Sequence, residues 1–176
     1  FMEMNTRIQV EHGITEMVSG VDLVREQLRI ASGLPLSVTQ EAVHITGHAI
    51  ECRVNAEDPA ADFRPCPGTV EFLHFPGGPG VRVDSCLYTG CQLPPWYDSL
   101  AAKVMAHAPT RLEAIRRMRR SLEEFILEGF PTNAELSYQI LYHPDFIRGC
   151  CTTAFLDEHL PELLEFRRRL EEETKV

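Results

Sequence analysis

Five side chains able to do chemistry stand at alternate positions near the start of the chain: Glu3, Asn5, Arg7, Gln9 and Glu11. Alternate residues share one face of a β-strand, so a strand here would present all five together. Glu3 and Asn5 offer the oxygen donors that Mg²⁺ prefers. Arg7 offers a planar fork for an oxyanion, Gln9 an amide donor and Glu11 a carboxylate that can accept a proton. The pattern predicts a metal, an anion and a base in sequence order.

The length of this segment sets a limit on that prediction. A straight strand would spread the five side chains over about 26 Å at about 3.3 Å per residue, which is too far for one small ligand. We therefore expect a bend near Thr6, where the apolar alternation lapses. A surface strand with its polar residues directed outward is the alternative, and spacing alone does not exclude it.

A second alternating run, residues 50–55, places Arg53 on a polar face. The ordinary interpretation of such a residue is a surface salt bridge, here to Glu51 or Glu57. On spacing alone this interpretation is preferred over a role in a site.

The elements that must position these residues are of two kinds. A helix is expected from Val21, with Asp22 as its N-cap and a stop at Gly33. Short alternating runs between residues 44 and 107, separated by Pro and Gly, are typical of an antiparallel sheet. These runs are 44–45, 48–55, 69–75, 81–84 and 101–107. The Gly-rich stretch 76–80 lacks a following Lys and Ser or Thr, so it is expected to be a turn rather than a phosphate loop.

Helices return after the predicted sheet. Thr110 and Glu113 have the spacing of a capping box, and an apolar stripe follows as far as Gly129. The same spacing recurs at residues 132 and 135, before a helix that Pro144 is expected to end, and a last helix is predicted from Pro161 to about residue 173. Strands grouped first and helices grouped later predict an α+β fold, with helices packed on an antiparallel sheet.

Composition excludes several classes of function. Seventeen Lys and Arg against 26 Asp and Glu give a net charge of −9, so nucleic acid is not an expected partner. The one basic cluster, residues 111–120, is interpreted as a solvated helix face. No apolar run is long enough to span a bilayer, so no membrane partner and a cytoplasmic location are expected. The six cysteines lack metal-binding spacing and are expected to be free thiols.

The opening run Glu3–His12, followed by Thr15-Glu16-Met17, resembles the C-terminal part of biotin carboxylase, the ATP-grasp enzyme or domain of acetyl-CoA carboxylase and its relatives. Glu-x-Asn is similar to ATP-grasp enzymes in general, whereas Arg-x-Gln-Val-Glu-His resembles the biotin-dependent carboxylases in particular. The resemblance covers essentially the whole chain. It continues through residues 26–31, 47–59, 95–99 and 131–133.

This resemblance implies an enzyme that uses ATP, Mg²⁺ (or Mn²⁺) and bicarbonate to carboxylate biotin on a carrier protein through carboxyphosphate. In acetyl-CoA carboxylase this is the first half-reaction, which serves fatty acid synthesis. The implied roles are metal binding for Glu3 and Asn5, bicarbonate binding for Arg7, Gln9 and Val10, proton abstraction for Glu11, and stabilisation of the biotin ureido oxygen for Arg53. Gly13 stands where the family usually has Pro after the His.

The resemblance also implies an organisation. Residues 1–33 would be the end of an ATP-grasp domain, contributing its last strand and helix, and residues 34–176 the biotin carboxylase C-terminal domain. The chain is then expected to be a fragment that is inactive without its N-terminal ATP-grasp lobe. The expected partners are a biotin carboxyl carrier protein, a carboxyltransferase and a second copy of the enzyme, with the neighbourhood of Arg82 at the dimer contact. The alternative is a non-catalytic oligomerisation or interaction module that retains the fold.

Overall fold

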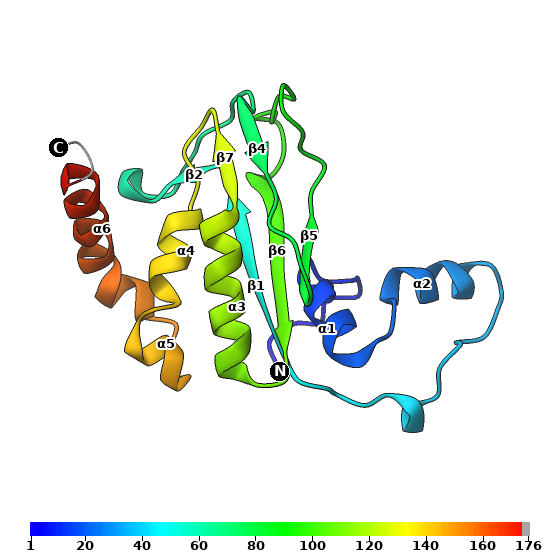
Figure 1. The fold of residues 1–176 in the computed structure, drawn as a ribbon. Helices are drawn as coiled ribbons and strands as arrows, with labels where there is room; N and C mark the ends of the chain where they lie inside the picture. Colours follow the sequence, from blue (N-terminus) through cyan, green and yellow to red (C-terminus); the bar gives the residue numbers. More distant parts are fainter. Residues whose placement is uncertain (174–176) are drawn as a thin grey trace.

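The centre of the structure, a computed structural model, is a three-stranded antiparallel sheet in the order β1-β6-β5 (Figure 1). β1 spans His48–Asn55, β6 spans Leu100–Ala108 and β5 spans Val81–Asp84. The structure describes residues 1–173, with side chains as far as residue 165. The runs predicted at 48–55, 81–84 and 101–107 are these three strands, and the predicted α+β class is confirmed.

The middle strand, β6, is buried on both faces. Its even-numbered residues, among them Val104 and Ala106, lie in the main apolar cluster with Ile115 and Met118. Its odd-numbered residues face α1 (His12–Ser19), where Met105 lies against Gly13. A central strand covered by helices on both sides needs few polar residues, which explains its nearly continuous apolar sequence.

Helix α3 (Arg111–Glu124) begins at the predicted capping box. Thr110 accepts from the backbone N–H of Glu113, and the Glu113 side chain accepts from the backbone N–H of Thr110. The predicted continuation of this helix to Gly129 is wrong. The chain leaves the helix at Phe125, which packs against Phe75, and then forms β7 (Ile126–Glu128). Strand β7 pairs with β4 (Phe72–His74), so an available strand edge outweighs the helical pattern of the last residues.

Three further helices complete the carboxyl-terminal half: α4 (Ala134–Ile140), α5 (Pro144–Arg148) and α6 (Phe155–Glu173). The second predicted capping box does not form, because Asn133 is the N-cap of α4 and its side chain bonds instead to β1. Pro144 begins α5 rather than ending α4, as suits a residue without an amide hydrogen. Helix α6 begins at Phe155 and contains Pro161, which was expected to start it.

The basic cluster on α3 is not simply a solvated face, as the sequence suggested. Arg111, Arg117 and Arg119 donate hydrogen bonds to backbone carbonyl oxygens of neighbouring elements, and Arg119 also stacks on an aromatic ring 3.6 Å away. The acceptors are Phe146 and Ile147 for Arg111, His107 for Arg117 and Leu141 for Arg119, and the ring belongs to Tyr142. These arginines therefore attach α3 to the sheet and to the C-terminal helices.

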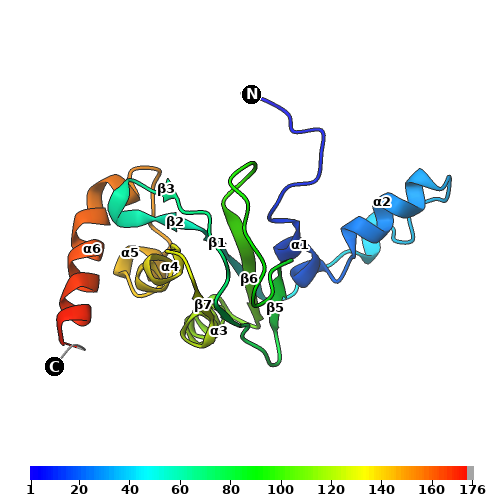
Figure 2. The same ribbon diagram turned by 90° about the horizontal axis from the view of Figure 1, so that it is seen from above.

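The predicted strand at residues 1–11 is absent. Residues 1–9 have no regular structure and extend away from the sheet (Figure 2). Met2 and Met4 are exposed. The backbone has no neighbouring strand to pair with in the described part of the chain, and a strand alone is not stable. A bend falls at Arg7, one residue after the predicted position, and a turn at 10–11 leads into α1, which the sequence analysis missed.

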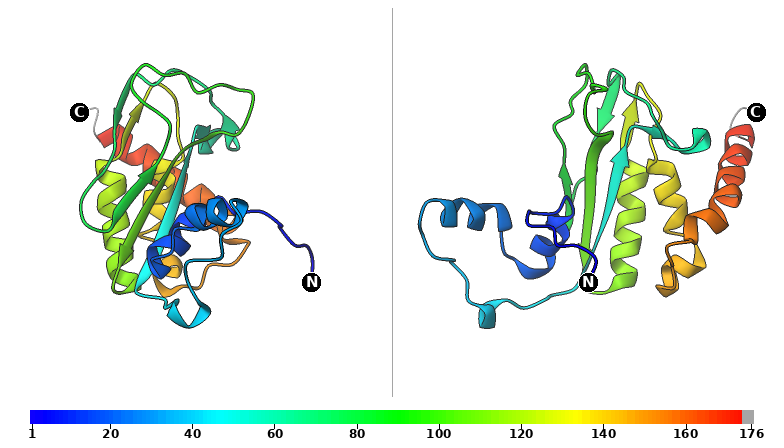
Figure 3. Two further views of the ribbon diagram at one scale, coloured as in Figure 1. Left: turned by 90° about the vertical axis from the view of Figure 1, so that its right-hand side faces the viewer. Right: turned by 180° about the vertical axis from the view of Figure 1, so that it is seen from behind.

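Helix α2 (Leu23–Ala31) begins as predicted, with the Arg25 N–H donating to Asp22 at 2.8 Å. It projects away from the sheet, and a long connection returns to β1 (Figure 3). That connection includes a 3₁₀ turn at Gln40–Ala42. Residues 44–45, which were expected to form a strand, have no regular structure.

The remaining elements are short. β2 (Glu57–Asp58) pairs with β3 (Arg64–Pro65), around a 3₁₀ turn at Pro59–Ala61. Residues 76–80 form a turn, with positive φ at Gly78 and Gly80. All six cysteines are free. Within residues 1–173, no helix combines the length and the apolar character needed to cross a membrane.

Candidate functional site

The sheet places a row of charged side chains on the face that carries α1. Arg53 of β1, Lys103 of β6 and Asp84 of β5 are directly paired across the three strands. Side chains at paired positions lie about 5 Å apart at their Cβ atoms, so the sheet fixes the spacing of this row. The site is assembled where the turn before α1 crosses this row.

Glu11 and Arg53 meet at one end of the row. A guanidinium N–H of Arg53 donates to the carboxylate of Glu11 at 2.5 Å, which brings together two of the predicted site residues 42 positions apart in sequence. Glu51 lies 3.7 Å from Arg53, as expected if Arg53 forms a surface salt bridge. The Glu51 carboxylate is more buried than that of Glu11. The tighter contact is the one that sequence spacing did not indicate.

Lys103 fixes the turn at residues 10–11 by a hydrogen bond from the sheet. Its ammonium donates to the backbone carbonyl oxygen of Val10 at 2.9 Å and lies 3.4 Å from Asp84. Only 9% of this lysine is exposed, so the bond to Val10 forms largely away from water. The peptide that joins Val10 to Glu11 is therefore fixed by a buried cation.

A second set of ion pairs attaches α1 itself. Arg82 donates to Asp84 at 2.8 Å and to Glu16 of α1 at 2.6 Å. The bonds to these two carboxylates raise the pKa of Arg82. Burial works against ionisation of Asp84, but the bond and charge of Arg82 and the charge of Lys103 outweigh it and lower the pKa of this carboxyl. The predicted dimer contact near Arg82 stays a prediction.

The other predicted site residues are only partly gathered. A guanidinium N–H of Arg7 donates to the side-chain oxygen of Gln9 and to the carbonyl of Ile8, each at 3.1 Å, on an exposed surface. Glu3 and Asn5 lie in the exposed segment that leads away from the sheet (Figure 2). The structure thus joins Arg7 with Gln9 and Glu11 with Arg53, and it does not bring the two proposed metal ligands to them.

The two carboxylates beside Arg53 differ in their electrostatics. The pKa of the Glu11 carboxyl lies below its ordinary value, because its own backbone N–H and then the charges of Arg53 and Arg7 favour the ionised form. Burial raises the pKa of Glu51, against the charges of Lys103 and Arg53. Glu11 is therefore an ionised proton acceptor whose basicity its neighbours reduce, whereas burial makes ionisation of Glu51 less favourable.

A cavity of about 360 Å³ opens beside Arg53. Val10, Asn55, Tyr97 and Ser99 also line it. The side-chain oxygen of Asn55 is buried there without a hydrogen-bond partner in the described part of the chain. An unsatisfied acceptor next to a guanidinium fits a small polar ligand that carries both N–H and C=O groups.

Asn133 supports the same strand from the other side. Its side-chain oxygen accepts from the backbone N–H of Asn55 at 2.8 Å, and its NH₂ donates to the carbonyl of Arg53 at 3.1 Å. These bonds fix the end of β1, where Arg53 and Asn55 stand.

The alternating sequence pattern indicated neither Lys103 nor the hydrogen bonds by which Asn133 supports β1. A single Lys within the apolar run of residues 100–108 was the signal that could have identified the former.

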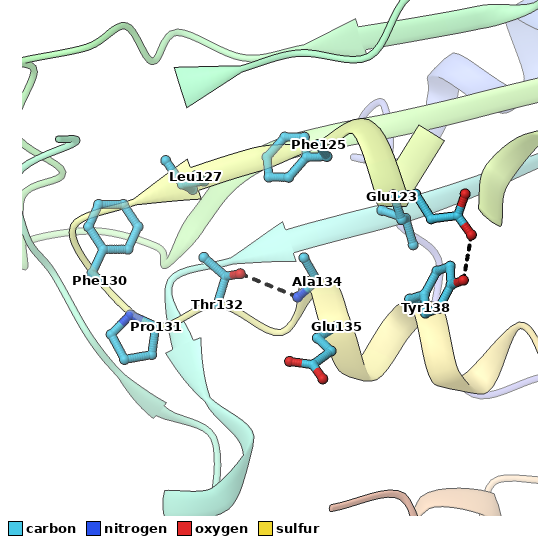
Figure 4. Close-up of a pocket in the computed structure, with 10 residues that line it drawn as sticks. Glu123, Phe125, Leu127, Phe130, Pro131, Thr132, Ala134, Glu135 and Tyr138 are labelled. Carbon is cyan, nitrogen blue, oxygen red and sulfur yellow. Dashed lines mark hydrogen bonds between the residues drawn. The ribbon is translucent and has the colours of Figure 1, made fainter. Parts of the chain in front are cut away.

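A larger cavity, of about 490 Å³, lies between α3, β7 and α4 (Figure 4). Tyr138 donates to Glu123 at its rim at 2.5 Å, and this bond raises the pKa of the tyrosine. None of the predicted site residues lines this cavity. Of the predicted site residues, Val10 and Arg53 line the smaller cavity.

Comparison with known proteins gives matches along the chain. Residues 51–158 match the family described as "Biotin carboxylase C-terminal domain", and residues 1–39 match "Carbamoyl-phosphate synthase L chain, ATP binding domain". The biotin carboxylase of Nostoc sp. is 54% identical over 90% of this chain and 35% of its own length. A pyruvate carboxylase subunit of Methanothermobacter thermautotrophicus is 52% identical over 90% of this chain and 32% of its own length. The chain spans about a third of these relatives.

Solved structures agree. The biotin carboxylase domain of 2-oxoglutarate carboxylase from Hydrogenobacter thermophilus, a dimer in complex with MgADP, ADP and bicarbonate, superposes with a TM-score of 0.90 at 47% identity. The match covers 93% of this chain and 36% of that one. The matched residues 51–158 include Arg53 and Lys103, which the sheet pairs. Because this match covers more than half of the residues, the chain belongs to the biotin carboxylase C-terminal domain family.

Proposed function

We propose that the protein carrying this chain is a biotin carboxylase, which uses ATP and bicarbonate to carboxylate biotin on a carrier protein. The observation that carries the proposal is the contact between Glu11 and Arg53 at the mouth of a polar cavity. It joins a proton acceptor from the opening segment to a cation on the sheet. Family membership supports the same conclusion.

Arg7, Gln9 and Val10 are proposed to bind bicarbonate. Arg7 offers its fork to the anion, and its bond to Gln9 turns both side chains to one place. Lys103 donates to the carbonyl of Val10 and so holds the peptide that joins Val10 to Glu11. A pre-arranged set of donors binds an oxyanion without reorganising during the reaction.

Glu11 is proposed to remove the proton of bicarbonate, so that the anion attacks the γ-phosphorus of ATP. The bond between this phosphorus and the β–γ bridging oxygen then breaks, ADP leaves, and carboxyphosphate is formed. The ion pair with Arg53 keeps Glu11 ionised but also occupies it. Arg53 must therefore move off the carboxylate before proton transfer. Arg53 also lines a cavity of about 360 Å³, and we propose that its guanidinium turns toward this space, meets the ureido oxygen of biotin and stabilises the negative charge that develops there.

Glu3 and Asn5 are proposed to bind Mg²⁺ or Mn²⁺. Their oxygen donors suit such a cation, which commonly takes one or two protein ligands and leaves the rest to water and phosphate. The metal would neutralise charge on the phosphates of ATP. This proposal rests on donor chemistry and on the family resemblance.

The proposed division of the chain is an ATP-grasp end at residues 1–33 and a C-terminal domain from residue 34. The remaining ATP-binding groups are assigned to an N-terminal ATP-grasp lobe, without which we expect the chain to be inactive. A biotin carboxyl carrier protein, a carboxyltransferase and a second copy of the enzyme are the proposed partners. Acetyl-CoA, the acceptor in fatty acid synthesis, is the proposed final acceptor. Pyruvate is the competing candidate, since a pyruvate carboxylase is among the similar proteins.

The experiment that tests this function is bicarbonate-dependent ATP hydrolysis by the intact protein and by its Arg7→Ala variant. Loss of the anion fork should reduce the rate about a hundredfold or more, because one pre-arranged donor is worth that much in comparable sites. Arg116→Ala is the matched control, since Arg116 is exposed on α3 and should leave the rate unchanged. A variant at position 7 that hydrolyses ATP as fast as the wild type would instead favour a non-catalytic interaction module.

A further inference from the structure

A cluster of two histidines and one aspartate lies outside the site described above. His143 is the N-cap of α5, Asp145 is in the first turn of α5, and His159 is in the second turn of α6. The two imidazole rings are 4.3 Å apart between centroids and inclined at 49°. One potential ligand atom from each residue lies within 4.8 Å of the other two.

The Asp145 carboxylate is aimed at both rings. Its Oδ2 lies 3.8 Å from Nδ1 of His143 and 3.7 Å from Nε2 of His159. Arg148 donates to the other oxygen, Oδ1, at 2.6 Å, which holds the carboxylate in this orientation. One oxygen is therefore committed to the arginine and the other is directed to the histidines.

The protein forms a partly enclosed wall around the cluster. The Phe155 ring lies 4.9 Å from each imidazole, edge-on to His143. The side chains of His143, His159 and Asp145 are only 14%, 25% and 31% exposed. Three groups that can each bind a metal ion are thus held together by packing.

The ligand chemistry of the cluster fits one shared cation, because two imidazole nitrogens and one carboxylate oxygen can bind the same ion. Nδ1 of His143 accepts from the backbone N–H of Asp145 at 3.2 Å, so this ring would bind through Nε2 or by giving up that bond.

We propose that His143, Asp145 and His159 bind one divalent transition-metal ion of the Zn²⁺ class and so connect α5 to α6. Two imidazole nitrogens and one carboxylate oxygen suit Zn²⁺, whereas Mg²⁺ and Ca²⁺ prefer all-oxygen sites. Tetrahedral Zn²⁺ places its ligand atoms about 3.4 Å apart, so the side chains must approach one another by roughly 1 Å or less on average. Three protein ligands leave the fourth position to water.

The test is calorimetric titration of the full chain, freed of any affinity tag and of bound metal, with Zn²⁺ alone. We expect one ion per chain, and a rise of roughly 5 °C or more in the midpoint of thermal unfolding at a hundredfold excess over Kd. His159→Gln should weaken this binding at least about tenfold, since loss of even a supporting group costs that much at known sites. Asp145→Asn, which retains the shape of the side chain, should weaken it similarly.

Two control variants separate this site from other ligands. His44→Gln removes an exposed histidine elsewhere, and the double variant Cys150→Ser/Cys151→Ser removes two exposed thiols near α5. Both should bind Zn²⁺ as the wild type does. Co²⁺ absorption spectra that lose intensity in His143→Gln but not in the cysteine variant would support the same site. The proposal is overturned if Zn²⁺ fails to bind, if binding survives both His159→Gln and Asp145→Asn, or if it is lost only with the cysteines.

Discussion

At the scale of single residues, Arg53 contacts Glu11 and also lines the cavity of about 360 Å³. The proposed function gives it two roles in turn, first beside Glu11 and then beside biotin. Glu51 is buried 3.7 Å from Arg53, and both of its oxygens lack hydrogen-bond partners in the described part of the chain.

We predict that Arg53→Ala in the intact protein reduces carboxylation of biotin more than it reduces bicarbonate-dependent ATP cleavage. The reason is that Arg53 is proposed to stabilise charge on biotin, whereas the anion is bound by Arg7. The loss in biotin carboxylation should be about a hundredfold or more. Parallel rate measurements of the two reactions check this, and an equal loss in both would show that the arginine is only structural.

The acid limb of the stability curve should depend on Asp84. Its folded-state pKa is lowered, so its contribution to the free energy of unfolding is fully present above the unfolded pKa of about 3.9 and is lost as pH falls through the folded value. Asp84→Asn should therefore be less stable than the wild type at pH 7, and the difference should shrink below about pH 4. Urea unfolding between pH 7 and acid pH measures it, with Asp157→Asn as an exposed control whose effect should stay small throughout.

The contacts of a residue could be predicted from the sequence where they depend on local spacing, and not where they depend on the tertiary fold. Arg53 was correctly placed on a polar strand face with Glu51 as a partner. Its contact with Glu11 depends on a turn and a helix, α1, that the alternating pattern concealed. Lys103 became relevant only through its register opposite Arg53, a long-range fact that no local window contains.

At the scale of elements, strand boundaries were predictable where period-two alternation was clear and failed where two patterns overlapped. The stripe on α3 continued in register to residue 126, yet the chain turns into β7 because β4 provides hydrogen-bond partners. Gly129 closes this unit, with a φ of +119° and a position against the carbonyl of Thr69.

Gly129→Ala tests how tightly the β4–β7 unit constrains the chain. A Cβ there would lie 2.0 Å from the Thr69 oxygen, and both groups are backbone, so neither can move aside without breaking the pairing. Strained φ and the clash together should cost about 3 kcal/mol or more, which corresponds to a fall of roughly 6 °C or more in the midpoint of thermal unfolding. Gly77→Ala, in open space with ordinary φ, is the control and should change the midpoint by no more than about 2 °C.

At the scale of the whole molecule, α2 differs from the body in how little of its apolar surface is packed. The sheet and α3 share one apolar core, whereas α2 exposes Val24, Leu28 and Ile30. A nine-residue helix without a packed apolar face is marginal in water.

We predict that hydrogen exchange separates these regions. Amides of residues 1–8 and of α2 should exchange within the fastest class, and those of β1 and β6 should be among the slowest, because only the latter are buried and paired. Mass spectrometry of exchange in the isolated chain and in the intact protein measures both. Protection of α2 in the isolated chain equal to that of β6 would contradict the expectation. Added protection of α2 in the intact protein would show that another part of that protein covers this helix.

The attachment of α1 has a consequence for the connection that follows it. Helix α1 is held to the sheet by Arg82 through Glu16, and the turn before it by Lys103, while residues 38–45 run mostly exposed between α2 and β1. Covalent continuity is thus not what keeps the proton acceptor beside the guanidinium. A single cleavage within 38–45 should leave two polypeptides that stay together with Glu11 still beside Arg53, which makes this loop a natural place to divide the chain into two complementing pieces.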